Sequence, residues 1–305
     1  MGETLDGRRA LMGLIAATAA APGLALSAQT LPATSPADPL KYLDTAGRLT
    51  VQARVNGQGP FAFMVDTGAN SSVIASEIAD QLGLTRGPRG EMHGIAGAQA
   101  VDTVRIEQLA VGRRIRKAMT LSVLPRSTLG ADGILGLEWL GRSSLLLDYA
   151  RRRMTVGEGL PVPDDQTFAV KARLQRSGLT LIDAFLPSRR VIAFVDSGST
   201  TTVGNLALLE EALRHDSVLG PTVETQLRSV TGQVLPGRLA VLSRLILGKI
   251  ILRRVPLVIG PIHTFDFWGM HDEPAMLIGS DILQKFQMVA MDFRAGEVRF
   301  RVFDH

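Results

Sequence analysis

The fold is decided by the stretch FAFMVDTG at residues 61–68, where an apolar run ends in an aspartate, a hydroxyl residue and a glycine. The same order returns in VIAFVDSG at residues 191–198. A short apolar run that is bounded by turn residues is typical of a buried strand. Each copy therefore predicts a strand that delivers an aspartate, Asp66 or Asp196, into a tight turn. One such triplet carries little information, but two that each close a strand indicate an internal repeat.

The segments around the two triplets repeat as well. Residues 49–55 alternate between apolar and polar side chains, which predicts a strand before the first copy. After each copy we expect a helix, a glycine-containing tip between two strands, an apolar pair followed by glycine, and a hairpin. These segments are residues 73–82, 93–98, 134–136 and 145–156 in the first half, and 206–213, 229–233, 277–279 and 291–300 in the second. The repeat predicts two similar β lobes, residues 47–160 and 161–305, related by a pseudo-two-fold axis.

The composition agrees with this architecture. Hydrophobic residues make up 46% of the 305 residues, which is enough for a core in each of two lobes. The 31 glycines and 15 prolines suit an all-β fold with many turns and short helices. Cysteine is absent, which excludes disulfides and thiolate catalysis. The five histidines lack metal-ligand spacing, and no phosphate-binding or dinucleotide-binding glycine pattern occurs, so we expect neither metal nor cofactor.

The first 46 residues predict an exported protein. Arg8 and Arg9 precede an apolar stretch at residues 11–26, and small residues follow. This order is typical of an export signal over residues 1–28, and the arginine pair resembles a bacterial twin-arginine signal. Residues 29–46 are rich in Pro, Ala, Ser and Thr and predict a linker or pro-segment. We therefore expect a periplasmic protein, with membrane attachment through an uncleaved N-terminal segment as the alternative.

The basic residues bear on the choice of partner. The net charge is +4, and basic runs occur at residues 113–117 and 151–153. The simplest interpretation is a solvated surface, and the alternative is association with an anionic membrane surface. Nucleic-acid binding is not expected, because no aromatic residues are interleaved with these runs.

Two aspartates that meet across a pseudo-two-fold axis have a definite chemistry. Neighbouring carboxylates do not both ionise easily, so the pair holds one proton at working pH. The ionised aspartate can take a proton from a bound water, and the protonated one can hydrogen-bond the carbonyl that the water attacks. The glycines of the triplets, Gly68 and Gly198, have two uses. They permit turn geometry closed to other residues, and they let the backbone approach a carboxylate.

The motifs Asp-Thr-Gly-Ala at residues 66–69 and Asp-Ser-Gly-Ser at residues 196–199 resemble those of aspartic peptidases of the pepsin and retropepsin group. The resemblance runs from about residue 47 to residue 303. It implies two acid-protease-type β-barrel lobes with the active-site cleft between them and Asp66 and Asp196 as the catalytic pair. It also implies that an apolar-apolar-Gly segment backs each catalytic loop and that the hydroxyls of Thr67 and Ser197 brace the loops against each other.

The resemblance further implies a flap that closes over substrate. Pepsins carry a flap tyrosine, but neither tyrosine of this chain lies in a flap-like position, so each lobe is more similar to a retropepsin. One chain would then complete the site as a monomer. The flap residues would be Gly94, Ile95, Ala96 and Gly97 in the first half, with Thr231 and Gly232 in the matching tip of the second.

The second half is longer between its aspartate and its backing glycine. We expect part of the excess at residues 261–271, which have three aromatic residues in four positions and no counterpart in the first half. They would form either a specificity wall beside the cleft or a hydrophobic plug under a loop.

The favoured function is an exported aspartic endopeptidase that acts on peptide or protein substrates with one activated water. The alternative is a peptide-binding module that has kept the fold and lost turnover.

A finer expectation concerns the pH dependence of the aspartate pair. A hydroxyl at the position of Ser199 can stabilise an ionised carboxylate, whereas Ala69 has none to offer. The pair should then keep its shared proton to higher pH than a pair with hydroxyls on both sides.

Overall fold

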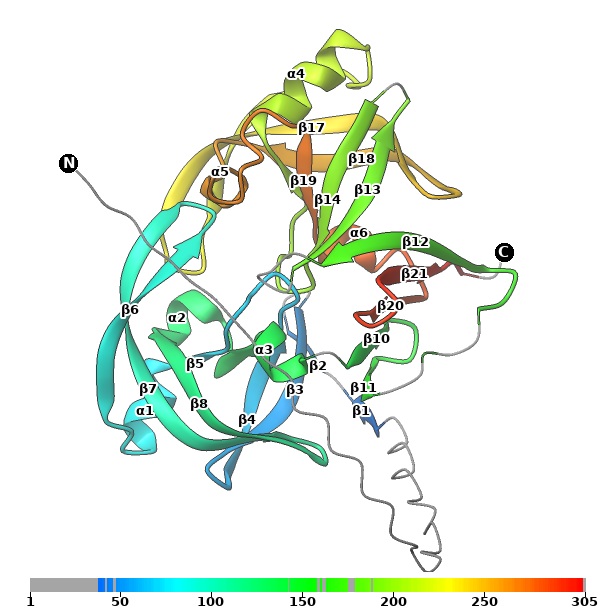
Figure 1. Cartoon of the computed structure of the whole chain (residues 1–305). Helices are drawn as coiled ribbons and strands as arrows, with labels where there is room; N and C mark the ends of the chain where they lie inside the picture. The colour runs from blue at the N-terminus through cyan, green and yellow to red at the C-terminus, as the bar shows by residue number, and fades with distance from the viewer. Residues whose placement is uncertain are drawn as a thin grey trace, which may run out of the picture. The chain divides into compact units, whose positions relative to one another are not determined.

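The computed structural model describes residues 38–41, 43–45, 48–141, 143–157, 160, 163–174, 179–187 and 189–303. The predicted export signal lies outside these ranges, as do residues 29–37 of the predicted linker. The described part of the chain is mainly β with short helices, which confirms the predicted fold class (Figure 1). All of it belongs to one unit, residues 35–305.

The first half contributes an eight-stranded sheet within the described residues. Its strand order is β2-β3-β4-β9-β5-β8-β7-β6. Asp66 directly follows β4, whose last residues pair in parallel with β9, so that Val65 lies opposite Leu135. The strands are β2 (Leu43–Thr45), β3 (Arg48–Val55), β4 (Gln58–Val65), β5 (Val73–Ala75), β6 (Arg86–Gly94), β7 (Gly97–Val111), β8 (Arg114–Leu124) and β9 (Gly133–Leu135).

The second half repeats this order strand for strand, as β12-β13-β14-β19-β15-β18-β17-β16. Asp196 directly follows β14, which pairs in parallel with β19, so that Val195 lies opposite Ile278. The predicted repeat is therefore a repeat of hydrogen-bonding topology. The strands are β12 (Thr167–Leu174), β13 (Thr180–Leu186), β14 (Arg189–Val195), β15 (Val203–Gly204), β16 (Val223–Arg228), β17 (Val234–Leu247), β18 (Ile250–Ile259) and β19 (Ala275–Ile278).

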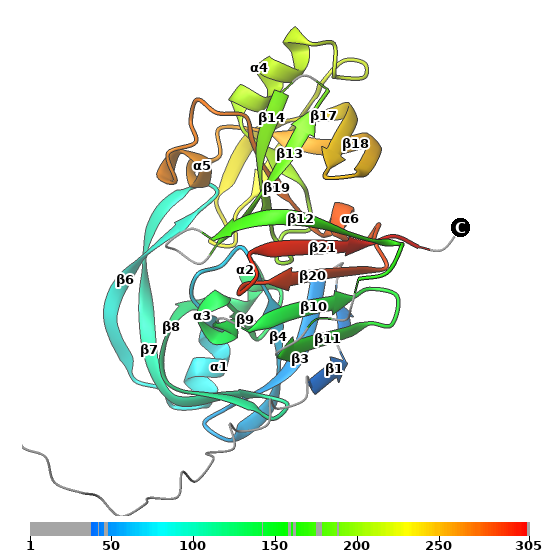
Figure 2. The ribbon, with the colours of Figure 1, turned by 45° about the vertical axis from the view of Figure 1, so that its right-hand side comes forward.

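A layer of six strands joins the two halves. Its order is β1-β11-β10-β20-β21-β12, and Figure 2 shows these strands side by side. The last of them, β12, pairs with β21 through its first part and with β13 through its end, which makes one thirteen-stranded sheet of the described strands. The strands are β1 (Asp38–Lys41), β10 (Ser144–Asp148), β11 (Arg153–Gly157), β20 (Met288–Asp292) and β21 (Glu297–Arg301).

Two short strands lie inside the segment that the sequence predicts as a linker or pro-segment. The strand β1 pairs with β11, and β2 pairs with β3. Residues 38–41 therefore take part in one sheet and residues 43–45 in the other, although their composition is that of a linker. The cause is backbone pairing with distant strands, which composition does not reveal.

The helices are short and lie between strands. The predicted helix at residues 206–213 is confirmed as α4, where the Asn205 side chain accepts the Leu208 N–H. The predicted helix at residues 73–82 is wrong in its first turn, because Val73 and Ile74 are buried in β5 and pair with β8 and β9. The helices are α1 (Ser76–Gln81), α2 (Arg126–Leu129), α3 (Leu137–Leu140), α4 (Leu206–Arg214), α5 (His263–Phe267) and α6 (Ser280–Leu283). Within the part of the chain that the structure describes, no helix combines the length and apolarity needed to cross a membrane.

One of the predicted basic runs is partly used inside the fold. Arg114 donates to the Leu140 carbonyl (2.7 Å), and Arg116 donates to the Trp139 carbonyl (2.9 Å). The guanidinium of Arg114 also lies 5.4 Å from the centre of the Trp139 ring. Burial, assisted by the charge of Arg116, lowers the pKa of Arg114. These two cations satisfy the carbonyl end of α3.

Candidate active site

Each aspartate stands where a buried strand ends. The Asp66 N–H donates to the Leu135 carbonyl (3.1 Å), and the Asp196 N–H donates to the Ile278 carbonyl (3.0 Å). Both aspartates are 8% exposed. The apolar-apolar-Gly segments predicted from the repeat thus fix the backbone of both aspartates in the same way.

The hydroxyl residues of the two triplets hold the two loops together. The Thr67 hydroxyl donates to the Val195 carbonyl (2.7 Å), and the Ser197 hydroxyl donates to the Val65 carbonyl (2.8 Å). Each hydroxyl oxygen also accepts the backbone N–H of the other triplet, at 3.0 Å for Ser197 N and 3.3 Å for Thr67 N. Both side chains are buried, so the four bonds form away from water and set the distance between the loops.

The glycines of the triplets leave room for the opposite carboxyl. A methyl group on Gly68 would lie 2.5 Å from Asp196 Oδ2, and one on Gly198 would lie 2.2 Å from the carboxyl carbon of Asp66. Neither glycine has a left-handed backbone conformation. Of the two roles that the sequence suggests for these glycines, the need for a special turn conformation is therefore wrong. Glycine is required because each loop backbone lies against the other aspartate.

Backbone amides orient both carboxylates. Asp66 Oδ1 accepts the N–H groups of Gly68 (2.8 Å) and Ala69 (3.0 Å). Asp196 Oδ1 accepts those of Gly198 (2.8 Å) and Ser199 (3.1 Å). With one oxygen of each carboxyl held by two amides, both side chains have a fixed orientation before any substrate binds.

The pair is arranged to hold one proton. Burial is the main cause that raises the pKa of Asp196 well above its usual range, and the charge of Asp66 and a hydrogen bond to Asp66 raise it further. The amides of Gly198 and Ser199 oppose the shift. A hydrogen bond that raises this pKa stabilises protonated Asp196, which then donates to an ionised Asp66. The site therefore combines an acid and a base in neighbouring positions.

The expectation for Ser199 is wrong in its geometry. The Ser199 hydroxyl donates to the Thr201 carbonyl (2.8 Å) and accepts the Thr201 N–H (3.4 Å). Only its backbone N–H reaches Asp196, as the backbone N–H of Ala69 reaches Asp66. The hydroxyl serves the local turn, so the presence of serine on one side and alanine on the other does not account for the pKa of the pair.

Sequence reasoning missed a second pair of hydroxyls behind the loops. Ser72 Oγ accepts the Gly136 N–H (3.0 Å), and Thr202 Oγ1 accepts the Gly279 N–H (3.0 Å). The two hydroxyls stand at the same distance along the chain from Asp66 and Asp196. Their shared offset in the repeat is the signal that could have identified them.

Two carboxylates complete this support, and they also escaped the sequence reasoning. Glu138 Oε1 accepts the Ser72 N–H (2.6 Å), while Asp281 accepts both the N–H (3.1 Å) and the hydroxyl (2.7 Å) of Thr202. Both acids occupy the same place after the backing glycine of their half. Partial loss of hydration raises the pKa of Glu138, although much of the residue stays exposed. Each Asp loop is therefore anchored to the helix that follows its backing segment.

The two glycine-containing tips lie against the opposite half of the molecule. A methyl group on Gly94 would lie 3.1 Å from the hydroxyl of Ser229, so the first tip reaches the second. A methyl group on Gly232 would lie 3.3 Å from a methyl carbon of Thr128 in α2. Thr231 bonds within its own tip, with its hydroxyl 2.9 Å from that of Ser229. Ile95 and Ala96 form the turn between β6 and β7.

The aromatic segment at residues 261–271 contains α5 and has two sides. Phe265 is 1% exposed, and Trp268 packs on Phe194 with ring centres 4.8 Å apart, which agrees with the hydrophobic plug. Phe267 is 51% exposed and stacks on His93 of β6 at 3.8 Å. The segment is thus a plug whose outer face contacts the β6–β7 hairpin.

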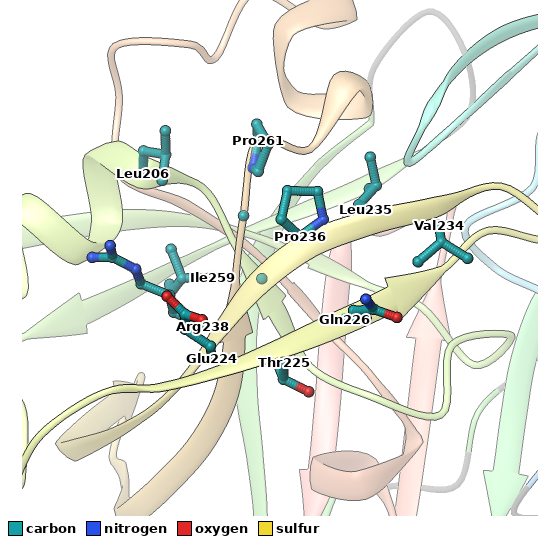
Figure 3. Close-up of a pocket in the computed structure, with 12 residues that line it drawn as sticks. Leu206, Glu224, Thr225, Gln226, Val234, Leu235, Pro236, Arg238, Ile259 and Pro261 are labelled. Atoms are coloured by element: carbon teal, nitrogen blue, oxygen red, sulfur yellow. The ribbon is translucent and has the colours of Figure 1, made fainter.

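Two cavities lie away from the aspartates. One has a volume of about 820 Å³ and is bounded by the β16–β17 ribbon on one side and by Leu206 and Pro261 on the other (Figure 3). The other, of about 750 Å³, is lined by residues of β8 with Ser71 and Glu138. Neither lining includes Asp66 or Asp196. We place the candidate active site at the aspartates, because paired carboxyls and oriented amides converge there.

Comparison with known proteins adds one match. The family model described as aspartyl protease matches residues 51–139, which include the Asp66 loop, the first tip and the first backing segment. No curated protein matches the chain. Among the described residues, no group of three His, Asp or Glu side chains is placed to hold a metal ion.

Proposed function

We propose that the chain, whose residues 51–139 match the family model described as aspartyl protease, is an aspartic endopeptidase that uses one water molecule held by Asp66 and Asp196. The observation that carries the proposal is the reciprocal brace of Thr67 and Ser197, which keeps the two carboxyls within hydrogen-bonding reach. The raised pKa of Asp196 supports different roles for the two acids.

In this mechanism Asp66 is the base and Asp196 is the acid. Asp66 takes a proton from the water, whose oxygen attacks the carbonyl carbon of the scissile peptide bond. Asp196 donates its proton to the carbonyl oxygen, which gives a neutral tetrahedral diol. The proton on Asp66 then passes to the amide nitrogen, and a diol hydroxyl returns a proton to Asp196 as the carbon–nitrogen bond breaks. The products are a carboxylic acid and an amine, and both aspartates regain their starting states.

The proposal includes a monomeric site that is closed by flaps. Each half supplies one aspartate, one backing segment and one tip, so a single chain carries every part. The tips meet the opposite half, and an extended peptide between them would require that they separate. Activity per chain should therefore not fall on dilution.

We also propose that the enzyme acts on peptides or proteins in the periplasm of a bacterium. This part rests on residues 1–28 alone, which carry the pattern of an export signal. Replacement of Arg8 and Arg9 by lysines should block export through a twin-arginine route. Unchanged export would exclude that route and leave the general secretory route or an uncleaved anchor.

The test of catalysis is hydrolysis of an unfolded protein, followed by mass spectrometry of new chain ends. We expect the wild type to cleave and both Asp66→Asn and Asp196→Asn to lose at least about 10³-fold in kcat/KM, because each removes one half of the acid–base pair. The matched control is Asp292→Asn, since Asp292 ends β20 and accepts the N–H groups of its own turn.

The alternative is a peptide-binding module without turnover. A peptide in which a hydroxyl-bearing tetrahedral carbon replaces the scissile carbonyl separates the two, because an enzyme binds a transition-state analogue far more tightly than the parent peptide. Equal affinity for the analogue and the parent peptide, with no cleavage by wild type between about pH 3 and pH 8, would favour the binding module.

A further inference from the structure

The first tip is fastened to α5 by three contacts. The His263 N–H donates to the Ile95 carbonyl (2.9 Å), and the ring of Phe267 stacks on His93 at 3.8 Å. The third contact joins His93 Nδ1 to His263 Nε2 at 3.2 Å. Figures 1 and 2 both show the β6–β7 hairpin reaching α5. The tip is therefore held by an element of the second half. The expectation that residues 261–271 have no counterpart is wrong for the helix itself, because α5 lies between β18 and β19 as the shorter α2 lies between β8 and β9.

The helix α5 is itself anchored on the strand that ends just before Asp196. Phe265 and Trp268, on its inner side, pack on Phe194, with ring centres 5.9 Å and 4.8 Å apart. Phe194 is buried in β14, two residues before the aspartate. The contacts of His263 and Phe267 thus connect the tip to the strand that positions Asp196.

The histidine pair has a defined capacity for protons. His93 Nε2 lies 2.8 Å from a carboxylate oxygen of Glu91, which calls for a proton on that nitrogen. His93 Nδ1 is then the acceptor in the neutral ring, and His263 Nε2 is the donor. One added proton on either ring preserves a donor and an acceptor between them. Two added protons place N–H against N–H between two positive rings, and the contact cannot form.

The two histidines and Glu91 set the charge at this contact, because the neighbouring residues on β7 and α5 are uncharged or paired elsewhere. On β7, the residues opposite His93 and Glu91 are Ala98 and Ala100, which carry no charge. On α5, Asp266 bonds His271 (2.7 Å) and raises the pKa of that histidine. The stacked neighbour, Phe267, is apolar.

We infer that His93 and His263 are positioning residues that hold the first tip against α5 while they share at most one added proton, so that substrate binding depends on pH through the tip. The inference rests on the proposed function, because it treats the tip as a flap. Acidification to the doubly protonated pair releases the tip, which raises KM and leaves kcat nearly unchanged, because the braced Asp loops do not move. The flap is thus tightest above the range in which both histidines are charged.

The first experiment needs no substrate. Hydrogen exchange of the His263 amide, corrected for its intrinsic pH dependence, is followed by NMR from about pH 7.5 to about pH 5, together with the ring nitrogens of both histidines. We expect protection of this amide to fall as the second ring becomes charged. Protection that stays constant through the second protonation would overturn the inference, whether or not the protein is a peptidase.

The second experiment uses variants of His263. In His263→Gln a side-chain N–H can still donate to His93 but cannot gain a charge, so we expect the acid rise in KM to disappear. In His263→Ala the contact is lost, and KM should rise about threefold to tenfold near neutral pH, the range spanned by one neutral hydrogen bond. The control is His215→Gln, because His215 pairs with Glu211 at the end of α4 (3.0 Å) and should leave KM unchanged.

The outcomes separate the two proposals. Absence of cleavage at any pH would refute the proposed function. The exchange of the His263 amide would still decide whether the histidine contact holds the first tip. If the pH dependence of KM is the same in wild type and His263→Gln, the proposed role of the histidine pair is refuted, while the proposed peptidase function still stands.

Discussion

The two Asp loops and the two hairpin tips show opposite degrees of symmetry. The loops match bond for bond, from the brace of Thr67 and Ser197 to the amides on each carboxyl. The tips differ in how they meet the equivalent helices α5 and α2. The first is hydrogen-bonded to α5 through His263, whereas the second lies beside α2, where a methyl group on Gly232 would come within 3.3 Å of Thr128. Under the proposed function, the two aspartates have equivalent supports, while only the first tip is hydrogen-bonded to the helix beside it.

Among the variants that leave both aspartates in place, the largest expected effect comes from changing the glycines of the two Asp loops. Gly68→Ala and Gly198→Ala place a methyl group within 2.5 Å of the opposite carboxyl, which must move. A displacement of about 1 Å can cost about 100-fold in turnover, and we expect at least that loss in kcat for both variants. Gly90→Ala is the control, because a methyl group there meets only Thr103 at an ordinary 3.5 Å. Normal turnover in the two loop variants would contradict the packing of carboxyl against backbone.

A smaller effect should follow from weakening the brace. Thr67→Val removes a buried hydroxyl and leaves the Val195 carbonyl and the Ser197 N–H without that partner. Such a loss costs about 1–3 kcal/mol of the free energy of unfolding, which denaturant titration measures. Ser197→Ala should cost a similar amount, and the double variant should cost less than the sum, because all four bonds join the same two loops and loss of one pair loosens the other. Thr67→Ser keeps the hydroxyl and should retain most of the stability. Strict additivity would show that the four bonds act independently.

The smallest effect sharpens the comparison at Ser199 and Ala69. Because the pKa of Asp196 is raised, turnover should persist above the usual carboxyl range and be lost as the pH rises through that raised value. The Ser199 hydroxyl bonds Thr201, so Ser199→Ala should leave the alkaline limb of kcat/KM within about 0.3 pH units of wild type. A clear upward shift would mean that the hydroxyl does reach the carboxylate during turnover.

Local patterns in the sequence were sufficient for the parts of the fold that depend on neighbours in the chain. The apolar runs before Asp66 and Asp196 predict β4 and β14, because a buried strand needs a continuous apolar segment. The same logic failed at Val73, where a short apolar run suits either a helix or a strand. This segment is a strand because β5 pairs with β8 and β9, and those partners are distant in the sequence.

The residues of the candidate site also fall into those that the sequence could predict and those that it could not. The aspartates and their hydroxyl neighbours could be identified because the triplet repeats. Glu138 and Asp281 also repeat, but an acid in a short helix has many ordinary uses. The contact between His93 and His263 joins residues 170 positions apart, and no second histidine pair among the described residues repeats it. No pattern in the sequence could therefore point to it.

The layer that joins the halves bears on what would happen if the chain were divided. The strand β10 hydrogen-bonds β11 on one side and β20 on the other. A fragment ending at residue 160 would carry β10 with an open row of N–H and C=O groups, and the complementary fragment would carry the same along β20. Open edges of this kind capture further strands, including those of identical chains. Covalent continuity between the halves therefore protects each of them from aggregation.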